Sequence, residues 1–182
     1  MSTPAVAPPL SHLPNALTIA RIVAIPVFVV VMLGTDDGHS VAAAVLFAVA
    51  GFTDQIDGWL ARRWRVESEF GKYADPLADR LMIDAAVVLL WHLDRLPWPG
   101  LLIILVRDVV LVAGSRIAVQ RGYEFSVSFL GKCATWVLYA AMVGYMISPP
   151  GEDYPVGLFW GGVGLALAAA AGYVAAVLRS RR

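Results

Sequence analysis

Six long stretches of mostly apolar residues, separated by short polar segments, set the pattern of this chain. A helix needs about 20 mostly apolar residues to cross a bilayer, and it satisfies its own backbone polar groups there. The pattern therefore predicts an all-α integral membrane protein with six transmembrane helices in one bundle. The predicted helices cover Leu17–Leu33, Val41–Trp59, Pro76–Leu93, Leu101–Val119, Leu130–Ile147 and Val156–Leu178.

Turn-forming residues mark three of the breaks, at Gly34–Gly38, Leu96–Gly100 and Pro149–Gly151. The first 14 residues contain four prolines and no Lys or Arg, so we expect a Pro-rich tail over 1–14 and one domain over 15–182. At the start of the sixth helix, small residues predict close packing against a neighbouring helix. They are Gly157, Gly161, Gly162 and Gly164.

The composition strengthens the membrane interpretation. Of 182 residues, 59% are hydrophobic and 15% are charged, whereas a soluble domain has about 25% charged residues. This excludes a soluble two-domain enzyme and a disordered chain. With 14 basic and 14 acidic residues, the balance gives no sign of nucleic-acid binding. The single cysteine, Cys133, excludes an internal disulfide.

Basic residues are placed asymmetrically about the six predicted spans. One side, which holds both termini and the loops after the second and fourth spans, receives nearly all of them, and the other side receives Arg95. Cytoplasmic loops of membrane proteins are enriched in Lys and Arg, so we expect both termini to be cytoplasmic. The residues on that side are Arg21, Arg62, Arg63, Arg65, Lys72, Arg80, Arg116, Arg121, Lys132, Arg179, Arg181 and Arg182.

Four aspartates occur where a membrane span should exclude them. Asp54 and Asp57 lie near the cytoplasmic end of the second span, and Asp75 and Asp79 lie at the start of the third. Their i,i+3 and i,i+4 spacings place each pair on one helix face. Facing carboxylates repel unless cations lie between them, and oxygen ligands suit Mg²⁺ or Mn²⁺. We therefore expect two divalent ions at this site, as in two-metal phosphoryl transfer. A single Asp would indicate only a helix cap or a surface charge.

The residues between the two pairs suit a phosphate-bearing ligand. Gly58 lets a ligand approach the backbone, and Ala61 keeps the same face shallow. Arg62 offers a planar fork to phosphate oxygens. Gly71 permits an unusual turn or a close contact where the third span begins, and Ser68 is either a hydroxyl donor to phosphate or an ordinary loop residue.

The segment from Asp54 to Asp79 resembles the signature of the CDP-alcohol phosphatidyltransferase family. It matches D-x2-D-G-x2-A-R-x8-G-x3-D-x3-D at all eight specified residues over 26 positions. The resemblance extends to N-x-L-T-x2-R in the first span, formed by Asn15, Leu17, Thr18 and Arg21. The six-span plan is also similar, so the resemblance covers nearly the whole chain.

The resemblance implies a membrane enzyme of phospholipid biosynthesis that displaces CMP from CDP-diacylglycerol by the attack of an acceptor hydroxyl. By similarity, the four aspartates hold the metal ions, and Asp79 also accepts the proton. The resemblance further implies a homodimer, with the active site at the cytoplasmic face. The expected contacts to the CDP-lipid donor come from Gly58, Ala61, Arg62, Ser68, Gly71, Asn15 and Thr18.

The acceptor is less clearly specified. A phosphorylated acceptor requires further cations, and Arg107, Arg116 and Lys132 are available, although Arg107 could instead pair with Asp108 or Asp84. The segment Gly131–Thr135 resembles the G-K-x-K-T of phosphatidylglycerophosphate synthases but has Ala134 in place of the second Lys.

We favour glycerol 3-phosphate as the acceptor. Arg107-Asp108-Val109 resembles the R-D-V of CDP-alcohol-type cardiolipin synthases, so phosphatidylglycerol is the alternative, followed by inositol phosphate. A cation transporter is the non-enzyme alternative, since buried aspartates also line ion pathways. Such a pathway requires carboxylates near the midplane rather than at one membrane face.

Overall fold

A computed structural model describes residues 13–64, 69–120 and 129–179, with side chains described over 19–53, 81–110 and 129–172. All the regular elements in these ranges are α-helices. They are α2 (Leu13–Leu33), α3 (Val41–Trp64), α4 (Glu69–His92), α5 (Trp98–Gln120), α6 (Phe129–Ile147) and α7 (Asp153–Arg179).

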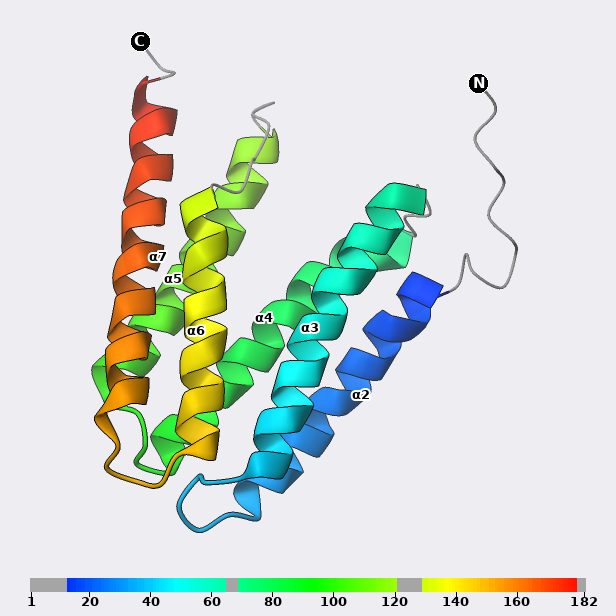
Figure 1. The fold of residues 1–182 in the computed structure, drawn as a ribbon. Coiled ribbons are helices and arrows are strands. Elements are labelled where there is room, and N and C mark those ends of the chain that lie inside the picture. The colour runs from blue at the N-terminus through cyan, green and yellow to red at the C-terminus, as the bar shows by residue number, and fades with distance from the viewer. Residues whose placement is uncertain (1–12, 65–68, 121–128, 180–182) are drawn as a thin grey trace.

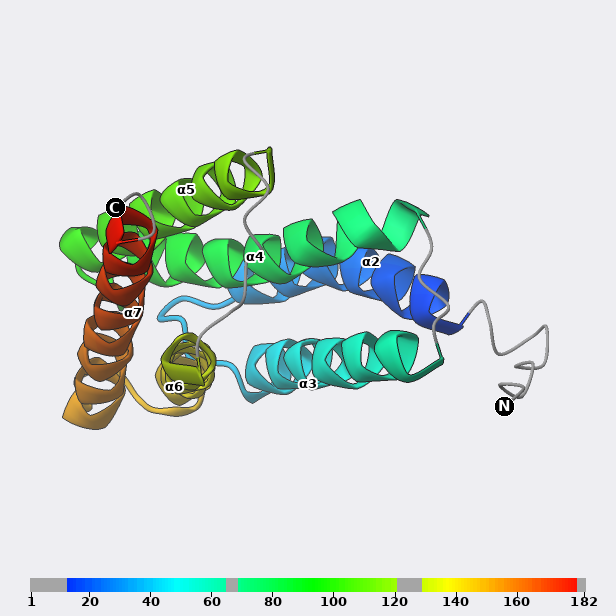
Figure 2. The same cartoon turned by 90° about the horizontal axis from the view of Figure 1, so that it is seen from above.

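The six helices form one bundle in which successive helices run in opposite directions (Figure 1). Contacts between neighbours close a ring in the order α2, α3, α6, α7, α5, α4 and back to α2. The helix α4 also contacts α3 and α6 across the ring. Seen along the bundle, α4 lies between α2 and α5 (Figure 2). The helix that carries Asp75 and Asp79 is thus the one with the most neighbours.

The alternating directions give the bundle two distinct ends. At the upper end in Figure 1, α2, α4 and α6 begin and α3, α5 and α7 end; we call this the site end. At the opposite end, which we call the loop end, short connections join α2 to α3, α4 to α5 and α6 to α7. At each end, the N-termini of three helices therefore lie beside the C-termini of the other three.

Apolar side chains occupy both the interior and the outer surface of the bundle. The interior contains Phe28, Phe47 and Met142, which are all at most 1% exposed. On the outside, Val30 is 70% exposed and Val109 is 69% exposed. Within the described residues, Phe129–Ile147 and Asp153–Gly172 are long and apolar enough to cross a membrane. An apolar exterior of this kind suits a lipid environment.

The loop end is built from residues with specific turn chemistry. Gly38 and Gly151 have positive φ angles of 72° and 94°, and Asp94 has φ 55° after the last turn of α4. Positive φ is accessible to Gly and, less readily, to Asp. Ser40 caps α3 by accepting a hydrogen bond at Oγ from the Ala43 amide at 3.2 Å. The breaks predicted at Gly34–Gly38 and Pro149–Gly151 are therefore confirmed. The break predicted at Leu96–Gly100 is wrong in its last three residues, since α5 begins at Trp98 rather than Leu101, and α7 likewise begins at Asp153 rather than Val156.

The predicted helices are confirmed, but three of them extend further at the site end. The helix α3 continues to Trp64 rather than Trp59, α4 begins at Glu69 rather than Pro76, and α2 begins at Leu13 rather than Leu17. The turns added to α3 and α4 carry charged residues, and the turn added to α2 carries Pro14 and Asn15, so the apolar pattern marked the apolar part of each helix and missed its extension. Gly71 consequently lies within the first turn of α4, so the unusual turn considered for it is wrong.

The four glycines of α7 do not act as one packing stripe. A Cβ atom at Gly162 would lie 2.9 Å from Leu138 Cγ on α6. At Gly157, Gly161 and Gly164, no described atom lies within 4 Å of such a Cβ. The prediction of close packing therefore holds for Gly162 and is wrong for the other three positions.

Candidate functional site

The four aspartates of the sequence motif lie on α3 and α4 at matched depths. Asp54 is ten residues before the end of α3 at Trp64, and Asp79 is ten residues after the start of α4 at Glu69. At about 1.5 Å of rise per residue, each lies about 15 Å from the site end of its helix. Asp57 and Asp75 lie closer to that end, at seven and six residues. The antiparallel helices therefore bring the two pairs to the same level of the bundle.

The helices that carry the aspartates contact each other, and both contact α2. The backbone of α2 holds Asn15 and Thr18 in its first two turns, at the site end. Gly58, Ala61 and Arg62 lie on the last two turns of α3. The side chains of Asn15, Thr18, Ala61, Arg62 and the four aspartates, and the surroundings of Gly58 and Gly71, lie outside the described residues, as does Ser68 entirely. Their contacts to metal ions and donor therefore stay predictions.

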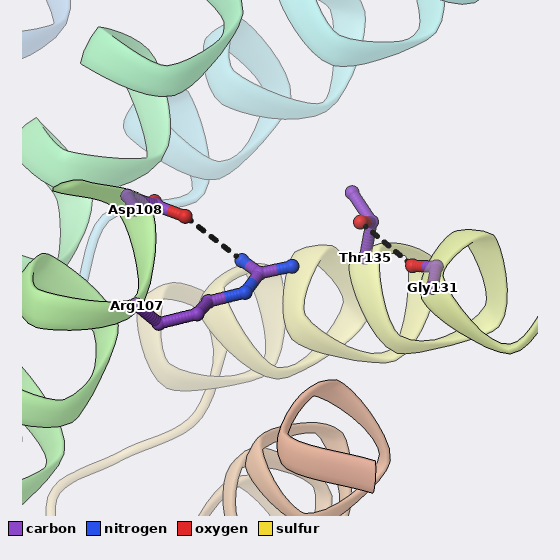
Figure 3. A network of polar contacts seen from close by, with 4 residues as sticks. All are labelled: Arg107, Asp108, Gly131 and Thr135. Carbon is purple, nitrogen blue, oxygen red and sulfur yellow. Dashed lines mark hydrogen bonds and ion pairs between the residues drawn. The ribbon is translucent and has the colours of Figure 1, made fainter. Parts of the chain in front are cut away.

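Arg107 on α5 is the predicted acceptor residue whose side chain is best defined. Its Nη1 atom donates to Asp108 Oδ1 at 3.1 Å, with side chains only 13% and 7% exposed. The guanidinium extends from α5 toward α6, the helix of Gly131 and Thr135 (Figure 3). Of the two pairings considered, the one with Asp108 is confirmed.

The same guanidinium retains unused donor capacity. Arg107 Nε is buried and has no hydrogen-bond partner among the described residues. An Arg side chain has five N–H donors, and a buried donor without a partner costs about 1–3 kcal/mol. A bound anion would satisfy these donors, so the geometry is compatible with the acceptor role predicted for Arg107.

The other two predicted acceptor residues lie nearer the site end. Lys132 is exposed in the first turn of α6, and Arg116 lies four residues before the end of α5, with its side chain outside the described part. Thr135 Oγ1 donates to the carbonyl of Gly131 at 3.1 Å, so its hydroxyl is engaged within α6. The structure therefore sets Lys132 and Arg116 apart from Arg107, which is near the middle of α5.

The side chains that are described add no second metal centre. Over 19–53, 81–110 and 129–172, no group of three or more His, Cys, Asp or Glu residues is close enough to hold a metal ion. Cys133 is a free thiol. The aspartates on α3 and α4, whose side chains lie outside these ranges, stay the candidate metal site that the sequence predicts.

Arg21 is a buried charge. It belongs to the first-span motif and was predicted to lie near a helix end at the membrane face, but its side chain is only 3% exposed within α2. Arg21 thus places a buried positive charge on the helix that contacts both α3 and α4. The available signal was an arginine within an otherwise apolar span.

Comparisons with known proteins agree with the motif. A family model described as CDP-alcohol phosphatidyltransferase matches residues 11–176. A CDP-diacylglycerol–glycerol-3-phosphate 3-phosphatidyltransferase of Bacillus subtilis is 33% identical over 143 residues, covering 72% of this chain and 74% of that protein. A protein of that same description from Escherichia coli is 32% identical over 142 residues, covering 76% and 78%. A probable phosphatidylglycerophosphate synthase of Mycobacterium tuberculosis is 36% identical over 143 residues, covering 77% and 68%.

Proposed function

The chain belongs to the CDP-alcohol phosphatidyltransferase family, and on that premise we propose that it transfers a phosphatidyl group from CDP-diacylglycerol to glycerol 3-phosphate. It is a membrane enzyme of phospholipid biosynthesis, and CMP is the leaving group. The single observation that carries the proposal is the complete Asp54–Asp79 motif on two antiparallel helices that contact each other. The relatives from Bacillus subtilis and Escherichia coli, both described as glycerol-3-phosphate 3-phosphatidyltransferases, support glycerol 3-phosphate as the acceptor.

Asp54, Asp57, Asp75 and Asp79 would hold the divalent ions on which this family generally depends. Four carboxylates at matched depth provide the oxygen-only ligand set that Mg²⁺ and Mn²⁺ prefer. When bound, two such ions supply charge neutralisation at the diphosphate. The residues present therefore fit the metal ions, and the use of two ions rests on the number of carboxylates.

Individual residues of the chain would accept the proton and bind the donor. Asp79 accepts the proton of the acceptor hydroxyl, whose oxygen forms a bond to the phosphorus atom that bears diacylglycerol. The bond from that phosphorus to the bridging oxygen breaks, and CMP leaves with the electron pair. Arg62 pairs with diphosphate oxygens, while Gly58, Ala61 and Gly71 leave room for the nucleotide, and Asn15, Thr18 and Ser68 orient it. A base within hydrogen-bond reach contributes about 10²–10⁴ to the rate.

The acceptor phosphate would bind to Arg107, whereas Lys132 and Arg116, which lie nearer the site end, would add positive charge on its approach. The buried Nε donor of Arg107 supports this assignment, because a phosphate oxygen would satisfy it.

We further propose that the six helices span the membrane, with both termini and the active site at the cytoplasmic face. The alternating helix directions and the basic residues at the site end support this topology. The homodimer implied by the family resemblance stays a prediction.

The test is a set of parallel reactions with purified protein, CDP-diacylglycerol and Mg²⁺. Glycerol 3-phosphate, phosphatidylglycerol and inositol phosphate are supplied separately, and both CMP and the lipid product are measured. We expect CMP and phosphatidylglycerophosphate with glycerol 3-phosphate, and no product after chelation of the metal ion. Product with phosphatidylglycerol alone would identify a cardiolipin synthase, and no CMP with any acceptor would contradict the catalytic proposal.

A further inference from the structure

The carboxylate of Asp108 determines how the guanidinium of Arg107 is oriented. The two side chains are largely buried, and Arg107 Nη1 donates to Asp108 Oδ1 at 3.1 Å. Successive residues on a helix point about 100° apart, so this pair forms only when the long Arg side chain adopts a conformation that reaches its neighbour. Asp108 therefore selects one orientation of a side chain that otherwise has many rotamers.

This hydrogen bond uses one side of the guanidinium and leaves another side for a ligand. The five N–H groups of an Arg side chain form a planar fork, in which Nε and Nη2 point along one edge and Nη1 lies outside it. Nε is buried and has no hydrogen-bond partner among the described residues. A phosphate group binds such an edge through two parallel hydrogen bonds. The contact with Asp108 thus leaves the Nε–Nη2 edge of Arg107 available to a phosphate.

Among the described residues, Asp108 is the one group that holds this guanidinium by a hydrogen bond. The guanidinium extends toward α6, where Thr135 Oγ1 donates its proton to the carbonyl of Gly131 at 3.1 Å (Figure 3). Without the carboxylate of Asp108, the Arg side chain would have to be ordered each time a ligand binds, and ordering a long side chain reduces affinity. Removal of Asp108 should therefore weaken the binding of an anion to Arg107.

The negative charge of Asp108 acts in the opposite direction. A carboxylate repels an anion that is bound to the neighbouring guanidinium, and it does so more strongly in a buried site than in water. If charge were the only effect, removal of Asp108 would strengthen anion binding. The sign of the change therefore separates positioning from charge. Asn keeps the Oδ1 acceptor and loses the charge, whereas Ala loses both.

We propose that Asp108 is a positioning residue, which holds Arg107 by Nη1 so that the Nε–Nη2 edge faces the phosphate of the acceptor. This inference rests on the proposed function, because it takes the acceptor to be phosphorylated and to bind Arg107. It assigns to Asp108 an effect on the acceptor that acts through Arg107 and involves no contact with the acceptor.

The test measures KM for glycerol 3-phosphate and for CDP-diacylglycerol in Asp108→Ala and Asp108→Asn. We expect Asp108→Ala to raise KM for glycerol 3-phosphate about fivefold or more and to change KM for the donor less than about twofold. Asp108→Asn should keep KM for glycerol 3-phosphate at or below the wild-type value, because Asn still accepts the hydrogen bond. Equal effects of the two substitutions, or a parallel rise in both KM values, would overturn the proposal.

Controls at Asp36 separate this effect from the general cost of losing a carboxylate. Asp36→Ala and Asp36→Asn make the same chemical changes at an exposed position of the loop end and should alter neither KM value. Thermal unfolding of each preparation shows whether the variant is folded. Because KM does not depend on the concentration of active enzyme, a partly unfolded preparation of Asp108→Ala would not imitate the expected result.

A double-mutant cycle tests whether Asp108 acts through Arg107. In an Arg107→Ala background there is no guanidinium to position, so Asp108→Ala should cause no further rise in KM for glycerol 3-phosphate. A second rise of similar size would show an independent structural role and contradict the proposal.

Calorimetric titration with glycerol 3-phosphate gives the same comparison without turnover. Kd should rise about fivefold or more in Asp108→Ala and stay at or below the wild-type value in Asp108→Asn. Kd values that do not follow this order would overturn the positioning role, even if the wild-type protein releases CMP. This order of Kd values in a protein that releases no CMP would support the positioning role and count against the proposed function alone.

Discussion

The side chain of Arg95, between α4 and α5, donates from Nη2 to the main-chain carbonyl of Tyr145 on α6 at 2.7 Å. The same nitrogen donates to the carbonyl of Ser148 at 2.8 Å, and Nη1 donates to the carbonyl of Asp37 at 3.2 Å. One guanidinium thus joins all three connections at the loop end. This end is held by hydrogen bonds to backbone carbonyls, whereas the proposed site at the other end is rich in carboxylates.

Replacement of Arg95 should therefore destabilise the protein. Hydrogen bonds to a charged group contribute about 1.5–3 kcal/mol each, and partial exposure reduces their sum. We expect Arg95→Ala to lower the free energy of unfolding by about 2–3 kcal/mol, and Arg95→Lys to recover part of that loss. Thermal unfolding in detergent measures the effect. Glu152→Ala, at an exposed position of the neighbouring loop, is the control, and an equal midpoint for Arg95→Ala and Glu152→Ala would contradict the prediction.

The sequence predicted the helices well because most of each helix is apolar, but the pattern could not define their polar ends. The start of α4 illustrates this difference. Residues from Glu69 to Asp75 include charged and small side chains with no apolar run, yet they are helical. At the loop end, by contrast, Gly and Pro define the breaks directly, since their backbone restrictions are local.

For the site, sequence spacing predicted which residue types lie on neighbouring helices but could not predict side-chain partners. The sequence left three roles open for Arg107: binding the acceptor, pairing with Asp108, or pairing with Asp84. Adjacent residues on a helix do not face each other, so the pairing with Asp108 depends on the reach of the long Arg side chain. Similarly, the carbonyl partners of Arg95 lie 50 or more positions away in the chain, so no local pattern could indicate them.

Packing between α6 and α7 offers a matched test of the glycines. A Cβ atom at Gly162 would lie 2.9 Å from Leu138 Cγ and 3.2 Å from its backbone nitrogen. We expect Gly162→Ala to destabilise the protein by about 1–3 kcal/mol, because the backbone of α6 cannot yield. Gly161→Ala should be neutral or stabilising by up to about 1 kcal/mol, since Ala favours helix and no described atom lies within 4 Å. Unfolding midpoints measure both, and equal midpoints would be inconsistent with this packing.

Substitution of Arg107 should raise the KM for the acceptor more than the KM for the donor. Removal of a guanidinium that binds the acceptor phosphate should raise KM for glycerol 3-phosphate by about tenfold or more, whereas KM for CDP-diacylglycerol should change little. Arg107→Ala tests this in steady-state CMP release, and Arg107→Lys should be intermediate because it retains the charge but loses the planar fork.

The ion pair with Asp108 could instead make Arg107 purely structural. In that case Arg107→Ala would lower the unfolding temperature and leave both KM values unchanged. Thermal unfolding of the same preparations therefore separates the two roles. A selective rise in KM for the acceptor in a protein of normal stability would support the binding role.

Asp79 should be required for catalysis and not for folding. Asp79→Asn removes the proposed base and weakens one metal ligand, so we expect CMP release to fall by about 10³-fold or more with a normal unfolding temperature. Asp94→Asn provides the matched control, because it makes the same chemical change at the loop end and Asn tolerates the φ of 55° found there. That control should keep full activity. If Asp79→Asn released CMP at a rate similar to Asp94→Asn, Asp79 could not be the proton acceptor, and the base would have to come from another residue.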